Sequence, residues 1–150
     1  MPGSWPQAEL PSLTDANCQV TSPATRQYNC LAWAASENFR NWWPDTLGVG
    51  YWPPGVPREV TTAMFLRAYA SRGFVLCFDG TREGGIEKMA LYGTGLQGSE
   101  IPTHAALQLE TGEWTSKLGD FEDIRHSAAA DVNGPVYGHV ICYLSRPRAV

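Results

Sequence analysis

The sequence predicts an α+β domain in which N-terminal helices pack on a C-terminal antiparallel β-sheet. Apolar residues recur at helical spacing in two early segments, 30–43 and 58–71. From residue 74 onward the chain consists of short β-type runs separated by glycine-containing turns. Because no strand–helix–strand alternation is present, the strands are expected to pair in the antiparallel direction.

The length of the chain predicts one folded unit. A chain of 150 residues is long enough to bury most of its apolar surface around one core. Residues 1–17 are expected to be an extended N-terminal segment, because Pro2, Pro6 and Pro11 interrupt regular structure there. Residues 18–150 are expected to form the single domain.

The first helix is expected over residues 30–43. Asn29 precedes it and is a favourable N-cap residue, and Pro44 ends it. Residues 45–57 are rich in proline and glycine but also contain a tyrosine and a tryptophan. We therefore expect an ordered loop that packs through its aromatic side chains.

The second helix is expected over residues 58–71, with Gly73 as its C-terminal cap. Asp120 is expected to cap a single helical turn that runs through Ile124. Short runs of β-forming residues predict strands at 74–78, 87–92, 103–110, 113–117 and 137–144.

The charge of the chain argues against two classes of partner. The formal net charge is -4 and no basic run is present, so neither nucleic acid nor an anionic membrane surface is expected to bind. No stretch approaches the roughly 20 apolar residues of a membrane span, and the first residues lack the features of a signal peptide. We expect a cytoplasmic protein, or one exported by a route that leaves no N-terminal mark.

The cysteines form no C-x-x-C pair, so the sequence offers neither a zinc site nor a thioredoxin-type redox motif. It also lacks the glycine-rich patterns that bind nucleotides. We expect no metal, no cofactor and four free thiols, which belong to Cys18, Cys30, Cys77 and Cys142.

Cys30 is the candidate nucleophile because it stands at the first position of an expected helix. Unpaired N–H groups and the helix dipole at that position favour a thiolate, which is the reactive form. The alternative is a small buried side chain without chemistry, which is common for free cysteine. A nucleophilic cysteine needs a base, and His104 is favoured because it opens a strand, whereas His126 and His139 are interpreted as surface or structural residues.

The third catalytic residue would orient the imidazole of His104 from the neighbouring strand. A three-residue loop at the hairpin places Ser116 on the face of His104, whereas a two-residue loop places Thr115 and Lys117 there. Gln108 shares that face in either case. We rank Ser116 first and Gln108 second.

Gln27 precedes the candidate nucleophile and is a candidate oxyanion donor. Its side-chain amide could act together with the backbone N–H of Cys30 on the negative oxygen of a tetrahedral intermediate. The alternative is an exposed loop glutamine without a role.

The segment Tyr-Asn-Cys-Leu-Ala-Trp-Ala at 28–34, followed by His-Ala-Ala-Leu-Gln-Leu at 104–109 and a glycine turn, resembles the papain-like superfamily and, within it, the NlpC/P60 type. Residues 28–146 are also similar to an uncharacterised bacterial domain family that has Asn-Cys-x-Ala-Trp-Ala, His-Ala-x-x-Gln and Trp-Thr-Ser-Lys-Leu-Gly segments. The first resemblance implies a papain-like fold with Cys30, His104 and Ser116 in the catalytic positions.

These residues favour a cysteine hydrolase or acyltransferase, such as a peptidase or an amidase, that forms an acyl-enzyme on Cys30. Its substrate would be a peptide or another molecule with an amide or ester bond. One alternative is a papain-like module that has lost catalysis and serves in binding or regulation. Another is a bacterial effector or toxin domain that acts as an amidase or deamidase, by analogy of fold.

Overall fold

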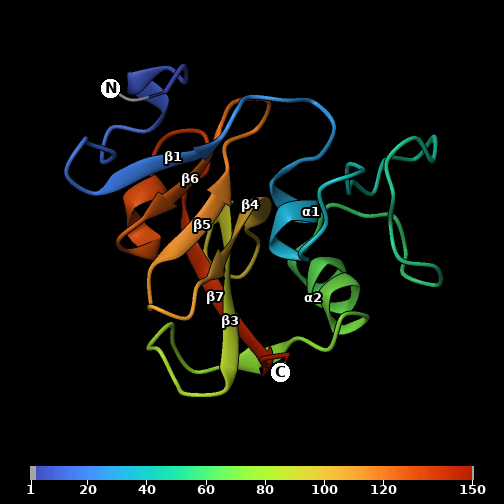
Figure 1. Cartoon of the computed structure of the whole chain (residues 1–150). Coiled ribbons are helices and arrows are strands. Elements are labelled where there is room, and N and C mark those ends of the chain that lie inside the picture. The colour runs from blue at the N-terminus through green and yellow to red at the C-terminus, as the bar shows by residue number, and fades with distance from the viewer. Residues whose placement is uncertain (1–2, 150) are drawn as a thin grey trace.

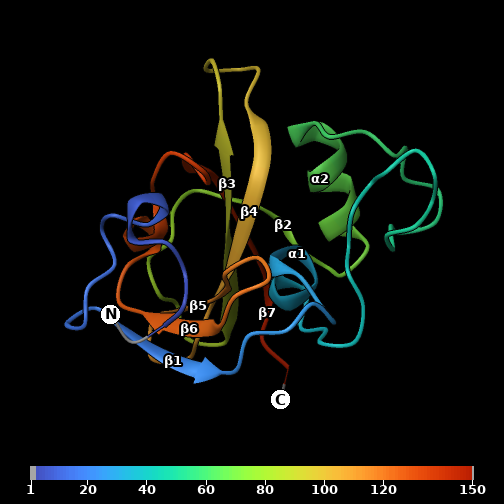
Figure 2. The same cartoon turned by 90° about the horizontal axis from the view of Figure 1, so that it is seen from above.

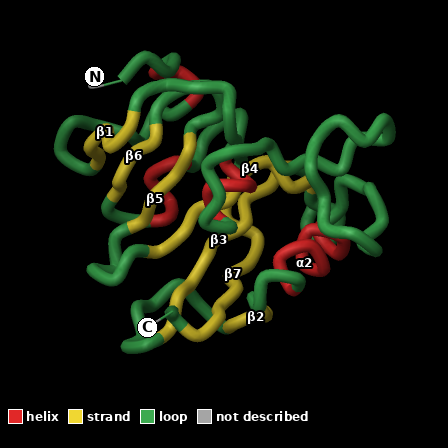
Figure 3. The backbone as a smooth tube through the Cα atoms, turned by 45° about the vertical axis from the view of Figure 1, so that its right-hand side comes forward, coloured by secondary structure: helices red, strands yellow, loops and turns green. Residues whose placement is uncertain are grey.

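A single antiparallel sheet of seven strands organises the computed structural model, which describes residues 3–149. Across the sheet the strand order is β1, β6, β5, β4, β3, β7, β2, so β1 and β2 form opposite edges (Figure 3). In chain order the elements are η1 (Gln7–Glu9), β1 (Cys18–Ser22), α1 (Cys30–Ala34), α2 (Thr62–Ala70), β2 (Val75–Cys77), β3 (Ile86–Thr94), β4 (Ile101–Gln108), β5 (Trp114–Lys117), β6 (Asp123–His126), η2 (Ala129–Val132) and β7 (His139–Pro147).

The two faces of the sheet are covered by different parts of the chain. Helices α1 and α2 lie on one face, and the N-terminal segment lies with η2 on the other (Figures 1 and 2). Because both faces are covered, the central strands β3 and β4 are buried at nearly every position instead of at alternate positions. On β4, Ala105 and Leu107 face the helices, whereas Ala106 faces the N-terminal segment.

The prediction of an α+β, papain-like domain with N-terminal helices on a C-terminal sheet is wrong. The described residues form a sheet-rich fold with two short α-helices, and strand β1 precedes both of them. Strand β1 pairs with β6 at the edge of the sheet. The side chains on one face of β1 are half-buried, and those on its other face are exposed. Its polar sequence, Cys-Gln-Val-Thr-Ser, therefore carries little of the hydrophobic signal that would have revealed a strand.

The helical turn predicted at 120–124 is also wrong, because residues 123–126 form strand β6. In this strand Ile124 and His126 share one face and are both buried, whereas Asp123 and Arg125 share the other, where Asp123 is buried and Arg125 is half-buried. Strand β6 lies between β1 and β5 and pairs with both. Its conformation is thus set by pairing with β5 across a hairpin and with the distant strand β1 rather than by local caps.

The first helix is much shorter than predicted, although its predicted cap is confirmed. The Asn29 side chain accepts a hydrogen bond from the Ala32 N–H at 3.1 Å. The helix ends at Ala34, and Ser36 adopts a left-handed backbone with φ of 66°. Helix α2 likewise begins at Thr62 rather than at residue 58, with the Thr61 side chain as its N-cap.

The N-terminal segment packs against the sheet. It contains the 3-10 helix η1 and buries Trp5, Leu10 and Leu13 on the face opposite the two α-helices. The predicted role of Pro2 lies outside the described residues. No helix within residues 3–149 is long and apolar enough to cross a membrane.

Candidate functional site

Cys30 is the first residue of α1, and its thiol lies where that helix packs against β4 and β5. The residue is 8 % exposed. Burial raises the pKa of the thiol to about 11, although the backbone N–H groups of Ala105, Leu31 and Cys30 and the charge of Lys117 act in the opposite direction. The start of the helix alone would lower this pKa, so burial decides the result. Cys30 therefore rests as a neutral thiol.

A buried relay of three side chains crosses neighbouring strands of the sheet. Nε2 of His104 on β4 lies 3.1 Å from Oγ of Ser116 on β5. The same Oγ lies 2.9 Å from Nε2 of His126 on β6, and Nδ1 of His126 lies 2.8 Å from the carbonyl oxygen of Ala128. His104 and Ser116 are fully buried, and His126 is 1 % exposed. The relay ends at His104 Nδ1, which is buried without a hydrogen-bond partner among the described residues.

Both imidazoles in this relay are neutral. Burial holds the pKa of His104 well below its usual range, and the neighbouring His126 acts in the same direction. Burial also lowers the pKa of His126. A neutral imidazole carries one proton, so each ring donates from one nitrogen and accepts at the other.

Two tyrosines hold the His104 ring. Tyr137 stacks on it with ring centroids 4.0 Å apart and planes 13° apart, and Tyr92 meets it edge to face at 5.1 Å. The hydroxyl of Thr103 donates to the Tyr137 carbonyl at 2.6 Å. Gly138 follows with φ of 72°, and a Cβ there would lie 2.0 Å from a backbone oxygen of β3. Only glycine lets the segment that carries Tyr137 approach so closely.

Cys30 and His104 are not hydrogen-bonded to each other in this structure. The thiol lies at the backbone N–H of Ala105, which faces α1, whereas the His104 ring packs between Tyr92 and Tyr137. Strands β4 and β5 pair only where Leu107 lies opposite Thr115 and Gln108 lies opposite Trp114, so β4 is not paired with β5 at His104. Thiol and imidazole thus flank the β4 backbone at two consecutive residues.

The other residues predicted for the site lie apart from it. Gln108 is buried at the end of β4, where its side-chain amide donates to the Gly80 carbonyl at 2.7 Å and ties down a loop. Gln27 is exposed, and its side chain makes no hydrogen bond to any residue in 3–149. His139 is exposed on β7.

Sequence reasoning missed His126 and the two tyrosines. The sequence predicts a surface or structural role for His126, and the structure places this residue in the core, on the same face as Ser116. In a strand, Ile124 and His126 lie on the same face, so the apolar Ile124 could have indicated that His126 also faces the core. Tyr92 is the direct partner of His104 across the β3–β4 hairpin, so the register of that hairpin determines its contact. Tyr137 comes from the segment before β7, and no sequence signal predicts its contact with His104.

A buried polar cluster fixes the segment that leads into α1. The Tyr28 hydroxyl donates to Asp123 Oδ2 at 2.5 Å, and burial raises the pKa of Asp123. Lys117 Nζ donates to the carbonyl oxygens of Thr25 at 2.8 Å and Gly119 at 2.7 Å. These bonds hold the residues before Cys30 against β5 and β6.

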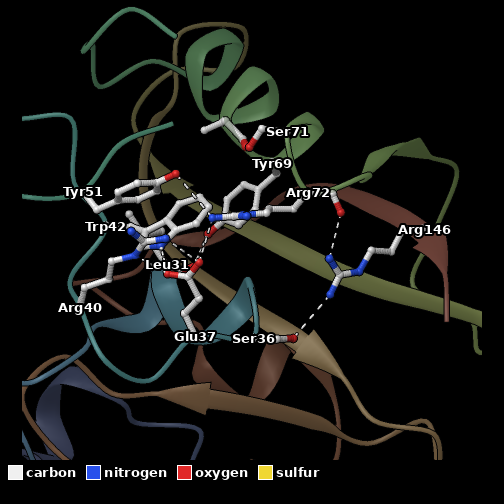
Figure 4. A network of polar contacts seen from close by, with 11 residues as sticks. Leu31, Ser36, Glu37, Arg40, Trp42, Tyr51, Tyr69, Ser71, Arg72 and Arg146 are labelled. Carbon is white, nitrogen blue, oxygen red and sulfur yellow. Dashed lines mark hydrogen bonds and ion pairs between the residues drawn. The ribbon is translucent and has the colours of Figure 1, made fainter. Parts of the chain in front are cut away.

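A second polar network fixes the other end of α1 (Figure 4). Glu37 accepts hydrogen bonds from the Arg40 guanidinium at 2.6 and 2.9 Å, from the Trp42 indole at 2.8 Å and from Arg72 at 2.8 Å. The Arg40 bond is the largest influence that lowers the Glu37 pKa. Arg146 extends the network by donating to the Arg72 carbonyl at 2.9 Å. Helix α1 is therefore anchored on both sides.

A hollow with a volume of about 180 Å³ is lined in part by Tyr137. Tyr137 forms part of its wall and also covers His104. The remaining lining is mostly apolar and comes from Trp5, Glu9, Leu10, Leu118, Gly119, Phe121 and Val136. Within residues 3–149, no group of three or more histidine, cysteine or acidic side chains is arranged to hold a metal ion.

Comparison with known proteins gave one family. A family model described as "Domain of unknown function (DUF7689)" matches residues 19–145, a span that includes Cys30, His104, Ser116 and His126. Neither the curated proteins nor the solved structures gave a match.

Proposed function

We propose that this chain, which belongs to the DUF7689 family, is a cysteine hydrolase or acyltransferase that acts on an amide or ester bond. One observation carries the proposal: His104 Nδ1 is a buried nitrogen without a partner, one residue from the N–H group that faces the Cys30 sulfur. Unsatisfied buried polar atoms are rare, and an imidazole nitrogen with a free lone pair can accept the proton of a thiol that reaches it.

In the proposed reaction, Cys30 Sγ attacks the carbonyl carbon of the substrate while its proton passes to His104 Nδ1. The carbonyl electron pair moves to oxygen, and the backbone N–H groups of Cys30 and Leu31, which already face the sulfur, supply donors for this oxyanion. His104 then returns the proton to the leaving nitrogen or oxygen as the bond to carbon breaks. Water or an amine attacks the resulting thioester, with His104 again acting as base.

The resting pKa values determine when the proton moves. A thiol with a pKa of about 11 and an imidazole with a lowered pKa rest as a neutral pair. Proton transfer is therefore expected to accompany the attack rather than to precede it. Cys30 belongs to the buried layer under the helices, whereas His104 faces the opposite layer with Tyr92. The proposed transfer therefore requires that substrate binding rearrange the chain around β4 and bring the sulfur into contact with Nδ1.

The experiment uses p-nitrophenyl acetate as the probe and mass spectrometry to locate the acetyl group. We expect release of p-nitrophenol with acetylation of Cys30, and loss of both in Cys30→Ala and His104→Gln. Cys142→Ala is the matched control, because burial also raises the pKa of this thiol to about 11. Equal hydrolysis by the wild-type protein and Cys30→Ala would end the proposal.

A second candidate function is a binding module without catalysis. It is favoured by the absence of a hydrogen bond between Cys30 and His104 and by the burial of both residues. The same experiment separates the two candidates. A folded wild-type protein that leaves the probe unhydrolysed and Cys30 unmodified would favour the binding module.

A further inference from the structure

We infer that His126 is a positioning residue, which holds His104 in the tautomer that has its proton on Nε2 and its lone pair on Nδ1. The importance of that lone pair for Cys30 rests on the proposed function. The tautomer itself follows from the hydrogen bonds of the relay, which can be assigned one by one.

The assignment begins at the Ala128 carbonyl, because an oxygen of this kind can only accept. His126 Nδ1 lies 2.8 Å from it and must therefore carry the proton. The Ala128 residue is itself held in place, since its N–H donates to Asp131 Oδ2 at 2.8 Å. His126 is 1 % exposed and neutral, so its Nε2 is left with a lone pair.

Ser116 passes the direction of hydrogen-bond donation from His126 to His104. Its hydroxyl has one proton, which it donates to the lone pair of His126 Nε2 at 2.9 Å. The Ser116 oxygen can then only accept on its other side. His104 Nε2, at 3.1 Å, is the donor.

His104 therefore carries its proton on Nε2 and presents a lone pair at Nδ1, the buried atom that lacks a partner. The reverse direction is excluded because it would require the Ala128 carbonyl to donate. Ser116 alone could not choose between the two tautomers, because a hydroxyl donates or accepts with equal ease. The choice comes from His126, one strand further along the sheet.

The first test needs no variant. Nuclear magnetic resonance of the protein labelled with ¹⁵N in its histidines should show His104 protonated only on Nε2 and His126 protonated only on Nδ1 at neutral pH. Exposed His139 is the internal reference and should exchange between both forms. A His104 ring protonated on Nδ1 would overturn the inference.

Two variants then test the role of His126. Gln at position 126 places a carbonyl oxygen where Nε2 stood, so His126→Gln should keep the His104 tautomer, whereas His126→Phe removes the acceptor and should populate the Nδ1-protonated form. Acetylation of Cys30 by p-nitrophenyl acetate should fall by about 100-fold or more in His126→Phe, since a wrong tautomer at a catalytic histidine is costly, and should largely persist in His126→Gln. An unchanged His104 tautomer in folded His126→Phe would contradict the inference.

These readouts separate the two proposals. If the tautomers follow the assignment while Cys30 stays unmodified in the wild-type protein, the positioning by His126 stands and the hydrolase proposal fails. If Cys30 is acetylated while the His104 tautomer is independent of residue 126, the hydrolase proposal stands and the inference about His126 fails.

Discussion

At the scale of single residues, burial outweighs local position in setting the chemistry of Cys30. Its place at the start of a helix, with three N–H groups facing the sulfur, favours the thiolate. Burial favours the thiol more strongly, and the pKa rises to about 11. A helix of five residues also provides a shorter dipole than the helix predicted over 30–43.

Alkylation measures this balance directly. In the native protein at pH 7.5, the reaction of iodoacetamide with Cys30 should be about 100-fold slower or more than with a free cysteine, whose pKa is about 8.5, because the thiolate fraction is that much smaller. Unfolding in urea should restore an ordinary rate, and mass spectrometry assigns the rate to Cys30. A native rate equal to that of the unfolded chain would contradict the raised pKa.

Sequence patterns could identify residues whose position follows from local rules. Asn29 was recognised as a cap, and strand alternation brought Ser116 to the face of His104 as one of two open registers. The hairpin turn decides between those registers, and the observed pairing of Leu107 with Thr115 places Ser116 beside His104. The role of His126 could not be predicted, because it depends on the pairing of β6 with β5.

At the scale of elements, α1 is a short helix that owes its position to neighbours on both sides. Five residues cannot sustain a helix by themselves. The Tyr28–Asp123 bond fixes its start, and the Glu37 network fixes the chain after its end (Figure 4). The hydrogen bonds of the Glu37 carboxylate to the nearby Trp42 indole and to distant Arg72 hold the chain after Ala34 in a non-helical path, which the apolar periodicity alone did not reveal.

Glu37→Gln tests this anchoring. The change removes the charge that accepts from two arginines at a side chain that is 12 % exposed, so we expect the free energy of unfolding to fall by about 2 kcal/mol in urea denaturation. Exposed Glu59→Gln is the control and should change stability by less than about 0.5 kcal/mol. Equal stability of the two variants would show that the network does not hold α1.

At the scale of the whole molecule, the sheet separates two buried layers, and the relay of histidines lies in the layer that the N-terminal segment covers. The sequence predicted an antiparallel sheet with five of its strands in roughly correct places. It did not reveal that both faces are covered, because the proline-rich first residues carry no periodic signal.

Two neutral histidines in this layer make the stability of the molecule depend on pH. The pKa values of His104 and His126 are lowered in the folded state, whereas unfolded histidines take up protons below about pH 6.5. The unfolded state thus binds more protons, and stability is lost as the pH falls below 6.5, by at most about 1.4 kcal/mol per pH unit for each histidine. Urea denaturation at pH 7.5 and 5.5 measures this loss.

The control for this pH dependence is His126→Gln, which should lose the part of it that comes from His126. Comparison between variants cancels the opposite effect of Asp123, whose raised pKa favours the folded state as the pH falls. A stability that is constant between the two pH values, in the wild-type protein and in His126→Gln alike, would contradict the lowered histidine pKa values.

The place of β7 in the strand order has a consequence for biosynthesis. Strand β7 lies between β3 and β2 and bonds to both, and within the described residues it is the only strand paired with β2. A ribosome releases β2 and β3 well before residues 139–147. Until that last strand emerges, the nascent chain exposes the edge of β3 and leaves β2 unpaired. The sheet is therefore completed only after translation of residues 139–147, and the incomplete sheet is the stage most exposed to aggregation.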